Sequence, residues 1–330
     1  MLHSNLSKNL SIFLLFCSLT FSANAAYIFI PMDESQSNHL KAYGIAYYAI
    51  ERDVKVDWLL NYQGGSFLIK QHSVIENECN IRGVSYQLIA DVQSTQILQS
   101  IASPEVNQDV VRLEKAPKIA IYSPNNKQPW DDAVTLALTY AEIPYEVIYD
   151  EEVLSNLLPL YDWLHLHHED FTGQYGKFYA SFKNATWYKD QKRDYEILAK
   201  KLGYEKVSQE KLAVAKKIKE FVNGGGFLFA MCSATDSYDI ALAAEGLDIC
   251  GPMFDGDAAD PNAQEKLDFS KTLAFKNFSL VKNPNQYEFS SIDATQKRRL
   301  NAKIDFFTLF DFSAKWDPVP TMLCQNHMQV

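Results

Sequence analysis

FVNGGGFLFAMCSATDSYDIALAAEG, residues 221–246, is the stretch that decides the fold. Glycines 224–226 end one helical pattern, and residues 227–231 then form an apolar run of strand length. Cys232 follows this run directly, and a helical pattern covers residues 238–244. A side chain at such a strand-to-helix turn lies at the carboxyl end of a sheet, beside free N–H groups of the next helix. The stretch therefore predicts an α/β sheet with Cys232 at its functional edge.

Two interpretations of Cys232 are open. The positive end of the following helix lowers the pKa of a thiol and favours a nucleophilic thiolate. Ser233 would then lie beside the reacting carbon, where helix N-terminal amides hold an oxyanion. Alternatively, Cys232 only packs in the core, because cysteine is among the most buried residue types. Ala230 and Ala234 stand where a nucleophile elbow has glycines, which favours the packing interpretation.

Apolar runs of strand length alternate with helical patterns along most of the chain, which is typical of a parallel sheet covered by helices. We expect a mostly parallel, doubly wound α/β sheet in residues 117–330. A smaller N-terminal α/β portion is expected in residues 26–116, and the polar stretch 104–117 connects the two. Residues 265–312 alternate polar and aromatic patches, which predicts strands of an edge element. The chain stops at Val330 without a cap or turn, which indicates a missing C-terminal element.

The N-terminus predicts export. Lys8 provides a weakly basic start, residues 12–21 are apolar, and Ala23-Asn24-Ala25 fits a cleavage site. Residues 1–25 are therefore expected to be a signal peptide, and the mature protein to be periplasmic or extracellular. No later segment is apolar enough for a permanent membrane span. The net charge of −10 disfavours a nucleic-acid or anionic-membrane partner.

The chain has five cysteines, and Cys17 lies in the expected signal peptide. The other four contain no C-x-x-C spacing and are too few for a disulfide scaffold. Export nevertheless permits pairing, and Cys232 and Cys250 lie on either side of one predicted helix. A disulfide between them is therefore the main alternative to a reactive thiol.

The order of these features resembles the class I glutamine amidotransferase-like family, whose fold is flavodoxin-like. The segments that carry the resemblance include the strand at 119–122, the loop at 162–169, the turn at Cys232 and the strand that ends at His327. The resemblance covers roughly residues 117–330. It implies that Cys232 is the nucleophile and His327 moves the proton. Gln329, which stands where the family has Glu, would orient His327. His168 and Glu169 would line the substrate pocket.

The whole chain also resembles a family of exported bacterial proteins that carry the name asparagine synthetase B. Three stretches carry this similarity: YIFIPMDESQSNHLKAYGIAYY, VDWLLNYQGGSF and DWLHLHHEDFTGQYGKFYASF. Asparagine synthesis itself is not expected. That activity needs a mature N-terminal cysteine and an S-G-G-x-D-S loop, whereas residues 233–237 read SATDS and lack glycine. We expect no cofactor.

Two further clusters have alternative interpretations. His165, His167 and His168, followed by Glu169 and Asp170, either bind zinc or hydrogen-bond the loop that follows the strand. The acidic residues Asp255, Asp257 and Asp260 either bind calcium or form a solvated loop.

These observations favour an exported amidotransferase- or amidohydrolase-like protein that uses a Cys–His thiol mechanism on an amide or a related small molecule. A non-catalytic binding relative of the same fold is the first alternative, because the glycines beside Cys232 and the expected Glu are missing. A metal-dependent hydrolase centred on the histidines is the second. The sequence does not specify the substrate, a protein partner or the oligomeric state.

Overall fold

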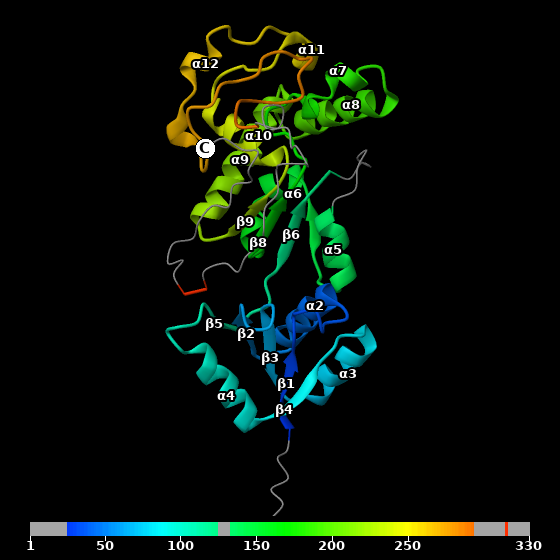
Figure 1. The fold of residues 1–330 in the computed structure, drawn as a ribbon. Helices are drawn as coiled ribbons and strands as arrows, with labels where there is room; N and C mark the ends of the chain where they lie inside the picture. The colour runs from blue at the N-terminus through cyan, green and yellow to red at the C-terminus, as the bar shows by residue number, and fades with distance from the viewer. Residues whose placement is uncertain (1–24, 125–132, 294–313, 316–330) are drawn as a thin grey trace, which may run out of the picture. The chain divides into compact units, whose positions relative to one another are not determined.

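The computed structural model describes residues 25–124, 133–293 and 314–315 (Figure 1). The chain divides between Ala116 and Pro117 into two compact units, and residues 314–315 belong to the first unit. Lys315 donates a hydrogen bond there to the carbonyl of Ile101 at 3.1 Å. Except for Ala25, the expected signal peptide lies outside the described residues. None of the helices in the described ranges is both long enough and apolar enough to cross a membrane.

The first unit is a five-stranded antiparallel sheet in the order β4-β1-β3-β2-β5. The expectation of a parallel arrangement is wrong for this unit, because β2 and β3 form a hairpin that places β3 between β1 and β2. The expected connector at 104–117 also contains a strand, β5. The strands are β1 (Ala25–Ile30), β2 (Val56–Leu60), β3 (Ser66–Lys70), β4 (Gln87–Ala90) and β5 (Asp109–Leu113), and the helices are α2 (His39–Ile50), α3 (Ser73–Arg82) and α4 (Asp91–Ile101).

Gly64 makes the hairpin possible. Its φ is +77°, and a Cβ atom at this position would lie 2.3 Å from the carbonyl oxygen of Met32. Only glycine tolerates both conditions. The turn is closed from the other side by the Met32 N–H, which donates to the carbonyl of Gln63 at 2.9 Å.

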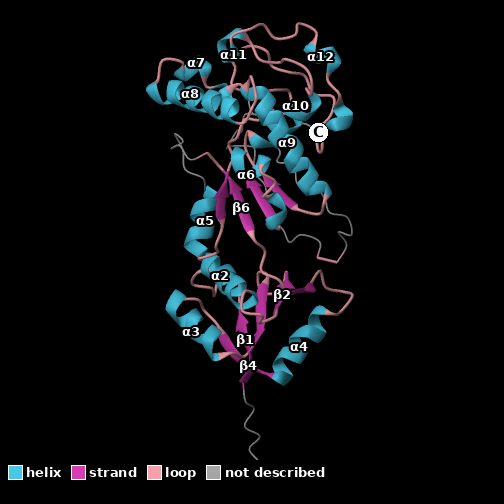
Figure 2. Cartoon of the chain, turned by 180° about the vertical axis from the view of Figure 1, so that it is seen from behind, coloured by secondary structure: helices cyan, strands magenta, loops and turns pink. Residues whose placement is uncertain are grey.

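Helices cover both faces of the antiparallel sheet. Figure 2 shows α2 and α3 on one side of it and α4 on the other. Ile28 and Ile30 of β1 pack with buried residues of α2 and α3, whereas Phe29 packs with Ile101 of α4. This alternation follows from the two-residue period of a strand. The elements from β1 to β4 follow the split βαβ order of ferredoxin-like folds.

The second unit contains a four-stranded parallel sheet in the order β7-β6-β8-β9. The parallel sheet expected for residues 117–330 is therefore confirmed for the described strands. Its strands are β6 (Ile119–Tyr122), β7 (Glu146–Ile148), β8 (Trp163–Leu166) and β9 (Phe227–Ala230). Its helices are α5 (Ala133–Ala141), α6 (Asp150–Leu154), α7 (Tyr179–Phe182), α8 (Thr186–Lys201), α9 (Val207–Asn223), α10 (Ala234–Ala243), α11 (Pro252–Asp255) and α12 (Ala263–Lys266).

Both faces of this sheet also carry helices. Leu164 and Leu166 of β8 belong to the larger core, which includes Ile218 of α9. Ile121 of β6 packs on the opposite face with Leu138 of α5. Figure 1 shows α5 and α9 on opposite sides of β6.

The segment after α10 has little regular structure. Within residues 265–293, the expected strands are reduced to an isolated bridge between Leu280 and Ser290 and a short 3-10 helix, Phe269–Lys271. Buried polar side chains hold the segment instead. Asp239 of α10 accepts backbone hydrogen bonds from residues 273, 274 and 275 at 2.7–2.8 Å. Lys177 donates to the carbonyls of residues 281 and 288 at 2.7 and 2.8 Å.

A buried ion pair connects α9 to the start of α6. Lys211 is 2% exposed, and its ammonium lies 2.6 Å from a carboxylate oxygen of Asp150. It also donates to the hydroxyls of Tyr149 and Tyr122 at 2.9 and 3.0 Å. The ammonium thus uses all three of its donors, which a buried charge requires.

We expect Lys211→Met to destabilise the second unit by about 3–5 kcal/mol, because Asp150 would remain as an uncompensated buried charge. The exposed pair between Lys201 and Glu151 provides the control. Lys201→Met should change the free energy of unfolding by only about 0–1 kcal/mol. Urea denaturation measures both values. Similar losses in the two variants would show that the buried Lys211–Asp150 pair contributes no more to stability than the exposed pair.

Candidate functional site

Cys232 lies at the turn between β9 and α10, in a strained backbone conformation. Its φ is +51°, a left-handed value that is uncommon for residues other than glycine. Hydrogen bonds hold the backbone on both sides of the turn: Met231 N–H donates to Leu166 O at 2.9 Å, and Ala234 N–H donates to His167 O at 3.2 Å. The side chain of Cys232 is exposed. The interpretation of Cys232 as a core-packing residue is therefore wrong.

The loops that follow the four parallel strands meet at one edge of the sheet. Pro124 follows β6, Tyr149 follows β7, Glu169 follows β8 and Cys232 follows β9. The loop after β8 is bonded directly to the first turn of α10, because the Ser237 hydroxyl donates to the carbonyl of Glu169 at 2.9 Å. Carboxyl ends of parallel strands are where open α/β sheets place their ligands.

Two carboxyl groups with raised pKa values lie at this edge, Asp236 buried and Glu169 partly buried. Burial raises the pKa of Glu169 to about 7, although the carboxylate accepts a hydrogen bond from His167 N–H at 2.8 Å, which lowers it. Burial, followed by the negative charge of Asp293, raises the pKa of Asp236 to about 8. Asp236 lies in the first turn of α10 and is 3% exposed. Its Oδ2 has no hydrogen-bond partner in the described parts of the chain.

The pKa of the Cys232 thiol is raised, not lowered. Although the residue is exposed, its sulfur is partly withdrawn from water, and this desolvation is the largest cause of the upward shift. The N–H of Ser233 bonds the sulfur and acts in the opposite direction, whereas the charges of Asp236, Asp293 and Glu169 raise the pKa further. The expectation that the helix N-terminus alone would favour the thiolate is therefore wrong.

Cys232 and Cys250 are both free, so the expected disulfide alternative is also wrong. Cys250 is fully buried, and its thiol lies 3.2 Å from the carbonyl of Thr172. The thiol of Cys250 thus has an acceptor of its own within the core. Cys79 is free and buried as well.

The three histidines do not assemble a metal site. His165 is fully buried, with Nδ1 3.1 Å from the carbonyl of Phe229. The rings of His167 and His168 stack with centroids 3.6 Å apart. Among the residues that the structure describes, the only converging group of three potential metal ligands is Asp248, Cys250 and Asp255.

Lysine ammonium groups pair with the carboxylates of the acidic loop. The Lys206 ammonium lies 2.9 Å from Asp255 and 2.6 Å from Asp257, and it also contacts Asp248. Asp260 pairs with Lys266 at 2.5 Å. The three aspartates considered for calcium therefore divide between two lysines, and Lys206 contributes the positive charge that a metal would contribute beside Cys250.

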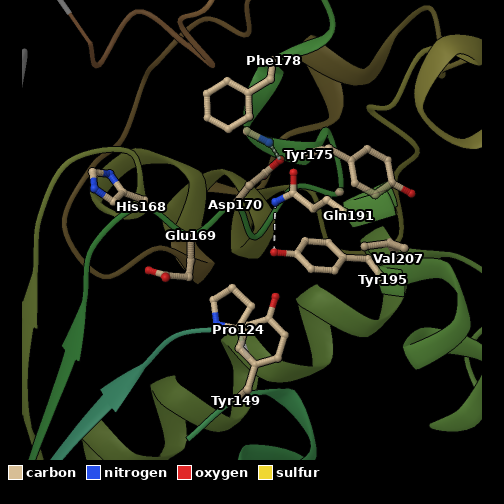
Figure 3. A pocket seen from close by; sticks show the side chains of 12 residues that line it. Pro124, Tyr149, His168, Glu169, Asp170, Tyr175, Phe178, Gln191, Tyr195 and Val207 are labelled. Atoms are coloured by element: carbon tan, nitrogen blue, oxygen red, sulfur yellow. Dashed lines mark hydrogen bonds between the residues drawn. The ribbon is translucent and has the colours of Figure 1, made fainter. Parts of the chain in front are cut away.

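A small cavity of about 20 Å³ lies beside the loop after β8. Figure 3 shows His168 and Glu169 on one side of this cavity, and Tyr195 and Gln191 on the other. The amide of Gln191 donates to the Tyr195 hydroxyl at 3.1 Å. A cavity of this size has room for about one water molecule or one small polar group. A larger groove, of about 400 Å³, lies at the opposite ends of the strands, around Asp162.

Asp170 shapes the loop that borders this cavity. Its carboxylate accepts hydrogen bonds from the N–H groups of Thr172 at 2.7 Å and Gly176 at 2.9 Å. Tyr175, Gly176 and Lys177 have consecutive left-handed φ values of 52°, 69° and 53°. Backbone strain of this kind persists only where the surrounding contacts fix it.

Of the residues expected at the site, the structure brings Cys232, Ser233, Glu169 and His168 to one edge of the sheet. His327 and Gln329 lie outside the described residues. Asp236, Asp293 and Tyr287, whose charges or hydroxyl interact with those of the Cys232 region, were not among the predicted site residues. Asp236 could have been found as an acidic residue in the first helical turn after Cys232. Tyr287 and Asp293 lie on the irregular segment, for which the local sequence gives no positional signal.

The raised pKa of Glu169 predicts a pH-dependent stability. The unfolded carboxyl ionises near pH 4.5 and the folded one near 7, so the folded state holds more protons between these values and stability falls as pH rises. Asp236 acts in the same direction up to about pH 8. Between pH 5 and 8, the free energy of unfolding should fall by about 1–2 kcal/mol less in Glu169→Gln than in the wild type, a range that allows for the partial exposure of Glu169. Urea titrations at a series of pH values measure this difference, and Glu265→Gln, at an exposed position, is the control. Parallel curves of unfolding free energy against pH for the wild type and Glu169→Gln would exclude a contribution of Glu169 to the pH dependence.

The positive φ of Cys232 predicts an unusual order of variant stabilities. Cys232→Gly should be more stable than Cys232→Ala by about 0.5–1 kcal/mol, because glycine removes the left-handed strain. Ser233, with a helical φ of −64°, is the control. At that position, alanine should be more stable than glycine. Thermal unfolding measures both orders, and the same order at the two positions would refute the strained turn.

Comparison with known proteins identifies no relative. No protein-family model matches the chain, and no curated protein or solved structure is significantly similar to it. The function therefore has to be inferred from the geometry and electrostatics at the carboxyl edge of the parallel sheet.

Proposed function

We propose that the protein is an exported, thiol-dependent hydrolase that acts on the C–N bond of an amide or a related small molecule. The observation that carries the proposal is the exposed thiol of Cys232, held at a φ of +51° where β9 passes into α10. Strained strand-to-helix turns of this kind expose the nucleophile of hydrolases above the sheet. Export is proposed from the signal-peptide pattern of residues 1–25.

The strand order supports the glutamine amidotransferase-like expectation. Numbered along the chain, the parallel strands have the order 2-1-3-4, which corresponds to the first four strands of the flavodoxin-like order. The order reverses between β6 and β8. In such sheets ligands bind at this switch point, outside the carboxyl ends. Pro124, His168 and Glu169 border the small cavity on this side of the sheet.

In the proposed reaction, the sulfur of Cys232 attacks the carbon of the C–N bond. The N–H of Ser233, which donates a hydrogen bond to the sulfur, is suited to stabilise negative charge at the reacting centre, on the sulfur before the attack and on the substrate heteroatom after it. The family resemblance assigns proton transfer to His327, oriented by Gln329. Within the described chain, Glu169 is suited to this work, because a carboxyl group with a pKa of about 7 exchanges protons readily at neutral pH.

One observation favours a second candidate function. The raised pKa of the Cys232 thiol keeps the sulfur protonated at neutral pH in the free protein. A non-catalytic protein that binds a small molecule at the same edge would share the fold and the loops. The metal-dependent hydrolase receives no such support, because the histidines do not converge with further ligands within the described ranges.

We expect iodoacetamide to modify Cys232 in the folded protein, faster as pH rises toward 9, while the buried Cys79 and Cys250 react only after denaturation. Peptide mapping by mass spectrometry separates these sites from Cys324. Ammonia release from a panel of small amides and amidines should fall by at least about 100-fold in Cys232→Ser. Equal release by wild type and Cys232→Ser would eliminate the thiol mechanism and leave the binding function.

A further inference from the structure

The charges around the Cys232 thiol are predominantly negative. The groups whose charges most affect its pKa in the described chain are the carboxyls of Asp236, Asp293 and Glu169, and each raises it. Lys177 is the cation whose pKa responds to Asp236, but its ammonium is bonded to two backbone carbonyls of the irregular segment. The sulfur therefore has an acidic environment without a dedicated positive partner among the residues described.

Asp236 differs from the other buried aspartates of this unit. Asp239 accepts hydrogen bonds from backbone N–H groups, and Asp150 pairs with Lys211. Asp236 is equally buried, yet its Oδ2 has no hydrogen-bond partner within the described ranges. Leaving a buried carboxyl oxygen unsatisfied is costly. A ligand that donates a hydrogen bond to Asp236 would remove this cost.

The ring of Tyr287 interacts electrostatically with the same groups. The charges of Cys232, Asp293 and Asp236 all raise the pKa of Tyr287, after burial as the main cause, and the value reaches about 12. Tyr287 therefore lies close enough to the thiol and to both carboxyls to interact with their charges. The face of a phenol ring attracts cations, particularly planar ones.

From the exposed thiol, the unsatisfied oxygen of Asp236, the carboxyl of Glu169 and the nearby ring of Tyr287, we propose that the site takes a cationic, planar carbon–nitrogen group, an amidinium or a guanidinium, rather than a neutral amide. This inference rests on the proposed hydrolase function and names its substrate class. Amidinium groups present paired N–H donors that match carboxylate oxygens.

The reaction of an amidinium balances without a cofactor. The Cys232 sulfur bonds to the central carbon, and the thiol proton passes to the departing nitrogen, which leaves as ammonia. Water then attacks the resulting thioimidate carbon, the S–C bond breaks, and the thiol is restored. The sum is amidinium plus water giving amide plus ammonium. A guanidinium group gives a urea group by the same steps.

A cationic substrate also explains how a thiol in acidic surroundings becomes reactive. An opposite charge within about 4–6 Å lowers a thiol pKa by about 1–3 units. The bound substrate would thus favour the thiolate only when it is in place. Asp236 and Glu169, whose pKa values of about 8 and about 7 leave them partly protonated at neutral pH, would ionise as the cation binds and would hold it together with Asp293. In the free protein, the raised pKa would keep the thiol protonated and therefore unreactive until a substrate binds.

The test compares two alkylating agents that differ in charge but share a leaving group, 2-chloroacetamidine and 2-chloroacetamide. The ratio of the alkylation rate by 2-chloroacetamidine to that by 2-chloroacetamide is measured at Cys232 and divided by the same ratio for glutathione. At pH 7.5 this normalised ratio should be at least about ten. Asp236→Asn and Glu169→Gln should each reduce this preference several-fold. Glu265→Gln, which removes an exposed carboxylate of α12, should leave it unchanged.

A measurement on the wild-type protein guards against misfolded variants. Benzamidine should protect Cys232 from chloroacetamide, whereas benzamide at the same concentration should not. A normalised ratio near one, with equal protection by both compounds, would overturn the cationic substrate while leaving a thiol hydrolase intact. A Cys232 that resists both reagents in the folded protein would overturn the hydrolase proposal together with this one.

Discussion

Two backbone hydrogen bonds between neighbouring loops set the geometry on which the site depends. Met231 bonds to Leu166 on the strand side of Cys232, and Ala234 bonds to His167 on the helix side. With the chain fixed at both points, Cys232, the middle of the three residues between β9 and α10, adopts a left-handed φ. The cost is about 1–2 kcal/mol, which the parallel pairing of β8 with β9 can absorb. The exposure of the thiol is thus a consequence of sheet register.

The irregular segment after α10 takes its position from buried polar side chains rather than from secondary structure. Asp239 accepts hydrogen bonds from three consecutive backbone N–H groups, and Lys177 donates to two carbonyls that are seven residues apart in the chain. Phe275, Phe278 and Phe289 then pack against α10. These contacts bring Tyr287 and Asp293 to the thiol, so two of the groups that control its charge depend on anchors outside the site.

Local patterns in the sequence predicted most strands and helices, and the strand–Cys232–helix unit in particular. They did not predict the antiparallel first unit, because element order alone does not show that β3 pairs with both β2 and β1 and so separates them. The close approach of Gly64 to the carbonyl of Met32, which the observed arrangement requires, is a contact between residues distant in the sequence. The helix-end argument at Cys232 was local as well, and it failed because desolvation raises the pKa of the thiol, followed by the charges of Asp236 and of carboxyls distant in the sequence such as Asp293. A short sequence motif does not predict which distant charged residues the fold brings near it.

The sign of the thiol shift follows from comparing magnitudes. A helix N-terminus stabilises an anion by about 0.3–1 kcal/mol, which is less than one pKa unit. Desolvation and each nearby carboxylate oppose it, and burial alone can shift a pKa by several units. The N–H of Ser233 therefore cannot produce a thiolate by itself. A thiolate at Cys232 would therefore require positive charge from elsewhere. Lys177 is hydrogen-bonded to backbone carbonyls, and Lys211 is paired with Asp150. Neither lysine of the described chain could supply this charge without breaking its own contacts, whereas a cationic ligand could.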